Sequence, residues 1–229
     1  MQISIEGVNY TIPVTLSEIT IHDRILYDKS YGADLRKEVE RIASMPDGFD
    51  KEMEALIYHG DLACKTLSHF GKIPMDIIQN TKMEDVFIIY HNAMSFLSQE
   101  VNFLSDDWQL KNEFDWDGGA WSIQPPELKH TSKIDFGEFL DSKQIVKNLF
   151  ELGDERWEAL LQLCCVFFRR KDEKYTKELA YENGERYNRL KNLPLEYALN
   201  VGFFLKGSMT FYLETSQYSG HPAKVLDQN

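Results

Sequence analysis

The feature that most constrains the fold is an apolar run with charged ends, ERWEALLQLCCVFFRRKDEKY, at positions 155–175. Its apolar residues recur at helical spacing, and Asp154 directly before it is a suitable N-cap. The uncharged part of this stretch, residues 159–168, is far shorter than the roughly 20 residues that cross a bilayer, so it predicts a buried helix in a soluble protein rather than a membrane span. The helix face expected in the core carries Trp157, Leu160, Leu161, Cys164 and Phe168.

The cysteines in this run do not indicate a reactive site. The chain has three cysteines, Cys64, Cys164 and Cys165. Adjacent helical residues point about 100° apart, so Cys164 and Cys165 are badly placed for one tetrahedral metal ion. Neighbouring cysteines do not readily pair with each other, and no C-x-x-C motif is present. We therefore interpret the cysteines as small core side chains and expect no metal and no cofactor.

Two further helices are predicted after this run. Thr176 is a suitable N-cap for residues 177–192, and Pro194 stands where a first helical residue is expected before 195–214. Together the three segments predict a C-terminal three-helix module. The last helix has more aromatic residues than one buried stripe needs, and such a surplus is typical of a partner-binding face. These candidate binding residues are Phe203, Phe204, Phe211 and Tyr212.

The N-terminal part predicts a hairpin followed by a helical body. Residues 2–12 alternate around Glu6-Gly7, as in a β-hairpin. Thr20 and Asp23 form a variant of the capping box that starts a helix expected to end at Gly32, with a new helix capped by Asp34. Later helices are predicted over 50–71 and 81–104. In the first of these, the expected buried face carries Met53, Leu56, Ile57, Ala63, Cys64, Leu67 and Phe70.

The centre of the chain predicts a second hairpin, rich in aromatic residues. Phe114 and Trp116 precede Asp117-Gly118-Gly119, and Trp121 follows. We predict that Trp116 and Trp121 bind a partner. The whole pattern indicates a mainly α (α+β) protein divided into an N-terminal hairpin with a helical region (1–105), a hairpin insertion (106–133) and a C-terminal helical module (134–229).

Charge argues against some functions. With 25 basic and 37 acidic residues the formal net charge is −12, which disfavours nucleic-acid binding. Arg169, Arg170 and Lys171 are expected at a helix C-terminus, where cations stabilise the helix dipole. The alternative roles for the two arginines are anchoring an acidic partner surface or, in an accessory protein, contacting nucleic acid.

Catalytic motifs are weak in this sequence. His59 and Asp61 are two residues apart and are the best candidates for an acid–base pair in a small hydrolase, which we keep as an alternative. No nucleophile motif or phosphate-binding loop accompanies them. The N-terminus has neither a basic n-region nor an apolar stretch, so no signal peptide is predicted. We expect a protein that is not an enzyme and does not enter a membrane.

Several segments carry a family resemblance. They are IDFGEFLD, FFRRKDEKY, ERYNRLKNLPLEYALNVGFFL and, at the N-terminus, ISIEGVNYTIPVTLSEITIHDRI. These segments resemble tail-assembly-chaperone-like and other virion proteins of tailed phages, including crAss-like phages and relatives that infect Bacteroidetes. Within the matching positions, the residues that carry the motif are Phe136, Phe139, Asp141, Tyr175, Arg186 and Pro194.

The resemblance implies a structural or assembly role. A protein of this kind would bind tail, neck or portal components, as a ring component or as a tail assembly chaperone, and would form a homo-oligomer. It would act in the host cytoplasm during assembly and, as a ring component, enter the virion. The implied motif residues hold helices together and supply no chemistry, so no catalytic residue follows from the resemblance.

Overall fold

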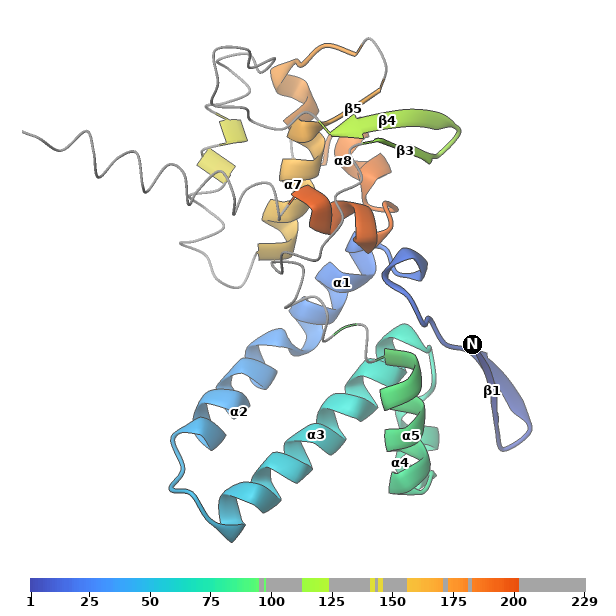
Figure 1. Ribbon diagram of the computed structural model, residues 1–229, viewed down its shortest axis with the longest axis vertical. Helices are drawn as coiled ribbons and strands as arrows, with labels where there is room; N and C mark the ends of the chain where they lie inside the picture. The colour runs from blue at the N-terminus through green and yellow to red at the C-terminus, as the bar shows by residue number, and fades with distance from the viewer. Residues whose placement is uncertain are drawn as a thin grey trace, which may run out of the picture.

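The computed structural model of the 229-residue chain describes residues 1–94, 97, 113–123, 141–142, 144–145, 156–170, 173–180 and 183–201. The fold is mainly helical with two small antiparallel sheets, which confirms the predicted α+β class with its N-terminal and central hairpins. Figure 1 shows two groups of elements that meet at α1 (Ile21–Tyr27). We call them the lower group, built around α3, and the upper group, built around α7.

The predicted N-terminal hairpin is confirmed. Strands β1 (Gln2–Ile5) and β2 (Val8–Thr11) pair antiparallel with Ile3 opposite Tyr10. The two turn residues Glu6 and Gly7 have φ values of 50° and 78°. Positive φ at both central positions is the geometry of the tight turn that matches strand twist, and it favours glycine.

The start of α1 is confirmed, but its predicted end is wrong. The Thr20 side chain accepts from the Asp23 backbone N–H, and the Asp23 carboxylate accepts from the Thr20 N–H, which completes the capping box. The chain then passes through a π-helical turn, η2 (Asp28–Gly32), directly into α2 (Ala33–Ala43). Asp34 therefore caps nothing, because the helix does not restart there.

Gly32 keeps this helix continuous instead of ending it. Its φ and ψ are helical, at −58° and −45°. A Cβ at this position would lie 2.5 Å from Oδ1 of Asp28, so glycine leaves room for a buried carboxylate. The Asp28 carboxylate pairs with Arg36 at 3.2 Å and faces Arg24 at 3.9 Å. The glycine thus serves packing here, which helix-ending rules do not anticipate.

The lower group consists of a long helix covered along part of its length. Helix α3 (Phe49–Phe70) begins after the Pro46–Gly48 turn and ends before Gly71, so both ends lie one residue from the predicted bounds 50–71. The short helices α4 (Met75–Asn80) and α5 (Met83–Met94) pack against it. The helical form of residues 83–94 is confirmed. The α3 residues that become buried are Ala63, Thr66, Leu67 and Phe70, all in its C-terminal half.

The upper group combines a helix with a three-stranded sheet. Helix α7 (Arg156–Phe167) runs straight into β5 (Phe168–Arg170), so the prediction that Arg169 and Arg170 end a helix is wrong. The sheet has the order β3 (Glu113–Trp116), β4 (Gly119–Ile123), β5. Strand β4 offers an unpaired edge whose backbone groups bind residues 168–170, and this pairing outweighs helix continuation.

The second helix of the predicted C-terminal module is interrupted. Residues after Thr176 form a single turn, η4 (Lys177–Ala180), and α8 (Glu185–Leu190) begins separately with Gly184 as its N-cap. Residues 195–201 are helical, and the Pro194 carbonyl accepts the first helical hydrogen bond, from Ala198 at 3.4 Å. Pro194 therefore stands at the N-cap, and the helix begins at Leu195, one residue later than predicted.

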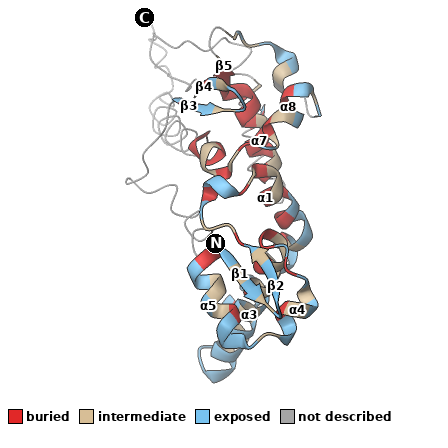
Figure 2. Cartoon of the chain, turned by 90° about the vertical axis from the view of Figure 1, so that its right-hand side faces the viewer, coloured by how far each residue is buried: buried red, intermediate tan, exposed pale blue. Residues whose placement is uncertain are grey.

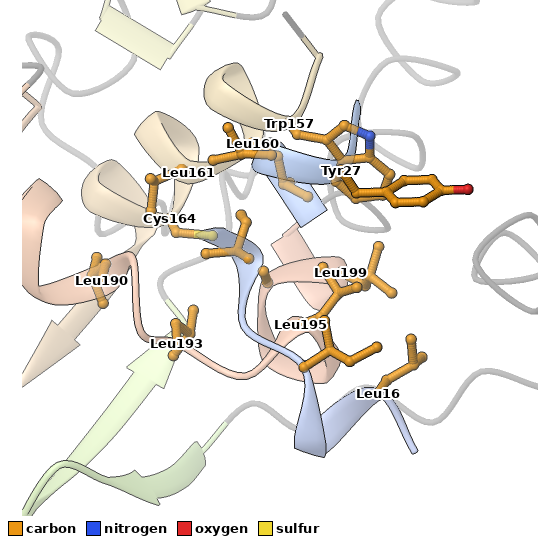
Figure 3. Close-up of a cluster of buried hydrophobic side chains, with 14 of the residues drawn as sticks. Leu16, Tyr27, Trp157, Leu160, Leu161, Cys164, Leu190, Leu193, Leu195 and Leu199 are labelled. Carbon is orange, nitrogen blue, oxygen red and sulfur yellow. The ribbon is translucent and has the colours of Figure 1, made fainter. Parts of the chain in front are cut away.

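The core fills the upper group and reaches α1. Figure 3 shows side chains from η1 (Leu16–Glu18), α1, α7, α8 and the segment after α8 packed together. Burial is densest along α7 and is low over the N-terminal half of α3 (Figure 2). The labelled members are Leu16, Tyr27, Trp157, Leu160, Leu161, Cys164, Leu190, Leu193, Leu195 and Leu199.

Residues far apart in the sequence join at α1. The backbone N–H of Ile21 donates to the Leu193 carbonyl at 3.0 Å, and that of Leu195 donates to the Ile19 carbonyl at 2.8 Å. Beside this pairing, the Arg24 guanidinium stacks 4.4 Å from the Trp157 ring centroid. The segment that leads into α1 is thus built into the C-terminal part of the chain.

Candidate protein-interaction surface

The structure brings half of the described candidate residues into one cluster around Trp121. Three guanidinium groups lie over its ring, from Arg170 at 5.1 Å, Arg186 at 5.5 Å and Arg189 at 5.9 Å. Trp116 packs beside it with ring centroids 5.6 Å apart, and the Trp121 Nε1–H donates to the Trp116 carbonyl at 3.0 Å. Stacked arginines of this kind fix the hairpin against β5 and α8.

Carboxylates balance part of this positive charge. Glu173 accepts from Arg186 Nη1 at 2.7 Å and from the Arg170 backbone N–H at 2.9 Å. Arg189 pairs with Asp117 in the β3–β4 turn. Arg186 also donates to the Phe168 carbonyl, so it links α8 to β5. These contacts use Arg186 inside the fold, between α8, β5 and Glu173.

Arg169 and Tyr175 form a second contact on the other side of β5. The Arg169 guanidinium lies 5.1 Å from the Tyr175 ring centroid and donates to the Phe168 carbonyl at 2.9 Å. The Tyr175 hydroxyl donates to the Asp141 carboxylate at 2.6 Å. The motif residues Tyr175 and Asp141 thus meet, although 34 positions separate them.

The side chains of this cluster mainly contact one another inside the fold, so the prediction that Trp121 and Arg169 bind a partner is corrected. Trp121 is 3 % exposed and Arg169 4 %, so neither offers a side-chain face to a partner in this structure. Trp116 and Arg170 are half-buried. The aromatic and cationic residues meet one another because stacking satisfies each of them inside the fold. The other predicted contacts and motif residues, Phe136, Phe139, Phe203, Phe204, Phe211 and Tyr212, lie outside the described residues.

Two of the three cysteines lie in the core, where small apolar side chains were predicted. Cys164 and Cys165 are fully buried, and Cys64 is half-buried. Burial raises the pKa of Cys165 to about 12 and raises that of Cys164 well above its ordinary value. Thiolates are therefore disfavoured at both positions, whereas thiolate is the form that reacts or binds a metal. Within the described ranges, no group of three His, Cys, Asp or Glu side chains could hold a metal ion.

The His59–Asp61 pair is not assembled into a site. Asp61 pairs with Lys65 at 2.6 Å, one turn along α3, and His59 packs its ring against Tyr58. Both residues are exposed on the helix. Two pockets among the described residues lie at the β3–β4 turn and beside the N-terminal hairpin, and neither His59 nor Asp61 lines them. The geometry gives no support to the hydrolase alternative.

An exposed apolar face lies on the N-terminal half of α3. Its members are 73 %, 40 %, 44 % and 61 % exposed in chain order, although they are large apolar side chains. The spacing i, i+4, i+7, i+8 places them on one face of the helix. Figure 2 shows this end of α3 as exposed. We call this face the α3 stripe, which consists of Phe49, Met53, Leu56 and Ile57.

Sequence reasoning assigned three members of the stripe to the core. The pattern was identified correctly, but the same face is buried only from Ala63 onward, where α4 and α5 cover it. The length of the predicted helix is the signal that could have distinguished the exposed N-terminal half of α3 from its buried C-terminal half. A 22-residue helix spans roughly 33 Å, and helices of 6 and 12 residues cannot cover all of it.

Comparison of the chain with protein families, with curated proteins and with solved structures found no match. Among the helices that the structure describes, none has the length and apolar character to cross a membrane.

Proposed function

We propose that the protein acts by binding other proteins in the assembly of a phage particle, as a ring component of the neck or tail or as a tail assembly chaperone. The α3 stripe is the observation that carries the proposal. Four large apolar side chains on one helix face remain 40 % to 73 % exposed in the folded chain. Burying them against a partner removes apolar area from water, worth about 25 cal/mol per Å².

The assignment to a phage particle rests on the motif resemblance. The described motif residues, Asp141, Tyr175, Arg186 and Pro194, all take part in contacts that hold the upper group together. In this proposal the upper group is the scaffold and the α3 stripe binds tail, neck or portal components. We further expect a homo-oligomer, present in the host cytoplasm during assembly and, as a ring component, in the virion.

The test combines purified protein with particles. Light scattering coupled to size-exclusion chromatography would be measured for the protein alone and with tail-tube, neck and portal proteins of the same phage. We expect co-elution with at least one of them, and its loss in Met53→Asp/Ile57→Asp. Val8→Asp is the matched control, because Val8 is 52 % exposed on β2, away from the stripe. A protein that is strictly monomeric, binds none of these components and is missing from purified virions would refute the proposal.

A further inference from the structure

We infer that the α3 stripe binds an amphipathic helix with basic flanking residues, contributed by a different protein. The inference rests on the proposed role in protein binding and adds the chemistry of the partner. Three observations carry it. They are the shape of the stripe, a glycine next to it on the same helix face and the charges along its two edges.

The shape of the stripe suits a helical partner. Phe49 to Ile57 covers about two helical turns, or roughly 12 Å, with Phe49, Leu56 and Ile57 projecting from one side. Side chains at these spacings form ridges that interlock with the grooves of another helix. Amphipathic helices commonly bind in this way through residues at i, i+3 or i+4, and i+7.

Gly60 extends the same face and has no packing role inside the fold. It lies three residues after Ile57 and seven after Met53, so it shares their side of α3. A Cβ built at Gly60 meets no atom within 4 Å. Glycine in a helix interior is less stable than alanine, and intramolecular packing does not explain it here. A bare helix surface beside large apolar side chains allows another helix to approach closely.

The edges of the stripe are acidic. Successive helical residues are about 100° apart, so Asp50, after Phe49, and Glu52, before Met53, lie on opposite edges. Neither carboxylate has an ion-pair partner among the described residues, whereas Lys51 pairs with Asp47 and Glu54 with Arg41. Lysines or arginines beside the apolar residues of a partner helix would complement both edges.

The same charges argue against two other occupants. In a second copy of this chain, stripe against stripe, Asp50 and Glu52 would face further carboxylates, and like charges at an interface are unfavourable. Nucleic acid would bring phosphates toward these acidic edges. A basic helix of another protein is the occupant that satisfies the apolar face and both edges together.

A designed peptide tests the chemistry directly. The probe is a fluorescent amphipathic peptide of about 20 residues with leucines at i, i+3, i+4 and i+7 and lysines beside them. A second peptide has glutamates in place of the lysines. Binding is measured by anisotropy titration with the full chain. Salt at about 0.15 M screens the long-range attraction between the basic peptide and the net negative charge of the protein. We expect Kd for the basic peptide to be at least about tenfold lower. Equal binding, or no binding of the basic peptide, would overturn the inference.

Variants locate the binding on the stripe. Ile57→Asp and Gly60→Gln should each raise Kd about tenfold or more, while Val8→Asp should leave it unchanged. Gly60→Gln places a good helix former in open space, so its thermal midpoint should equal or exceed that of the wild type. If Gly60→Gln keeps its fold but no longer binds the basic peptide, the peptide binds at the α3 stripe. If both variants bind like wild type, the peptide binds elsewhere and the inference is wrong.

The outcome separates this inference from the proposed function. Co-elution with a tail or neck protein without binding of the basic peptide would leave the proposed function standing and reject the helix. Stripe-dependent peptide binding without any association with phage components would reject the phage role and support the helix. A dimer that disappears in Ile57→Asp would identify the second copy as occupant and overturn the inference.

Discussion

His69 shows how burial determines the charge of a single side chain in this protein. Its ring packs against Tyr27 and Phe70, with centroids 5.4 and 4.8 Å away, and its Nε2 lies 2.9 Å from the Asp23 carbonyl oxygen. Burial lowers the pKa of His69 below its ordinary value, and the contact with the Asp23 carbonyl only partly opposes this. The folded protein therefore favours the neutral imidazole.

The first prediction concerns the pH dependence of stability. As pH falls through the ordinary histidine pKa of about 6.5, the unfolded chain binds a proton that folded His69 resists. The free energy of unfolding should decrease, whereas above about pH 7.5 both states are neutral and no effect remains. Urea unfolding between about pH 7.5 and 5.5 should show a weaker pH dependence in His69→Gln than in wild type. Exposed His59→Gln is the control, and identical slopes for all three proteins would contradict the prediction.

Two glycines in helical conformation predict opposite effects of the same substitution. Gly60→Ala adds a methyl group in open space and should raise the free energy of unfolding by about 0.5–1 kcal/mol. Gly32→Ala places a Cβ 2.5 Å from the Asp28 carboxylate, which is buried and paired with Arg36. Displacing that carboxylate should cost about 1–3 kcal/mol. Chemical denaturation of both variants gives the change in the free energy of unfolding for each. A change of the same sign in both would contradict the packing described for Asp28.

At the scale of elements, Trp121 joins the hairpin to the rest of the upper group. Its ring contacts arginines from β5 and α8, and its side chain is almost fully buried. Trp121→Ala should therefore lower the free energy of unfolding by about 3–5 kcal/mol. Trp116→Ala on the same hairpin should cost less, because Trp116 is only half-buried. Urea denaturation followed by far-UV circular dichroism measures both, and a larger loss at Trp116 would reverse the assigned roles.

Local signals predicted elements well where the cause was local. The Thr20 capping box, the Glu6-Gly7 turn and the Asp117-Gly118 turn depend on neighbouring residues, and the structure confirms each. The predicted helix end at Gly32 failed because the glycine accommodates Asp28. Residues 168–170 formed a strand because β4, more than 40 positions earlier, offers hydrogen bonds. Such long-range causes are not encoded in local spacing.

The candidate surface could be predicted only in part, for the same reason. Apolar periodicity identified one face of α3, with Met53 and Leu67 on it, but not where cover by α4 and α5 ends. Conversely, Trp121 and Arg169 have the residue types of binding hot spots, and the fold uses them internally. Residue type indicates how much a side chain gains from burial, whereas tertiary packing decides whether this chain or a partner buries it.

At the scale of the whole molecule, the two groups of elements share backbone and side-chain contacts. Residues 19–22 bond to residues 191–195, and Arg24 of α1 stacks on Trp157 of α7. The ion pair between Lys29 and Glu158, at 2.6 Å, adds a contact farther along the same helix. Since α1 continues through η2 into α2, a change in the upper group reaches the lower group through one uninterrupted helix.

The last prediction follows from this connection. Leu193 is fully buried, and its carbonyl accepts from Ile21, so Leu193→Ala should lower the free energy of unfolding by about 2–5 kcal/mol. In a Trp108→Phe background, the fluorescence of the remaining tryptophans, Trp116, Trp121 and Trp157, reports the upper group, whereas far-UV circular dichroism includes the long α3. If the groups unfold as one unit, both signals should shift to the same new midpoint, as two-state unfolding requires. Exposed Ile57→Ser should move either signal by no more than about 0.5 kcal/mol. A fluorescence midpoint that moves alone would show that the lower group folds independently, and α1 would then be a linker between two cooperative units.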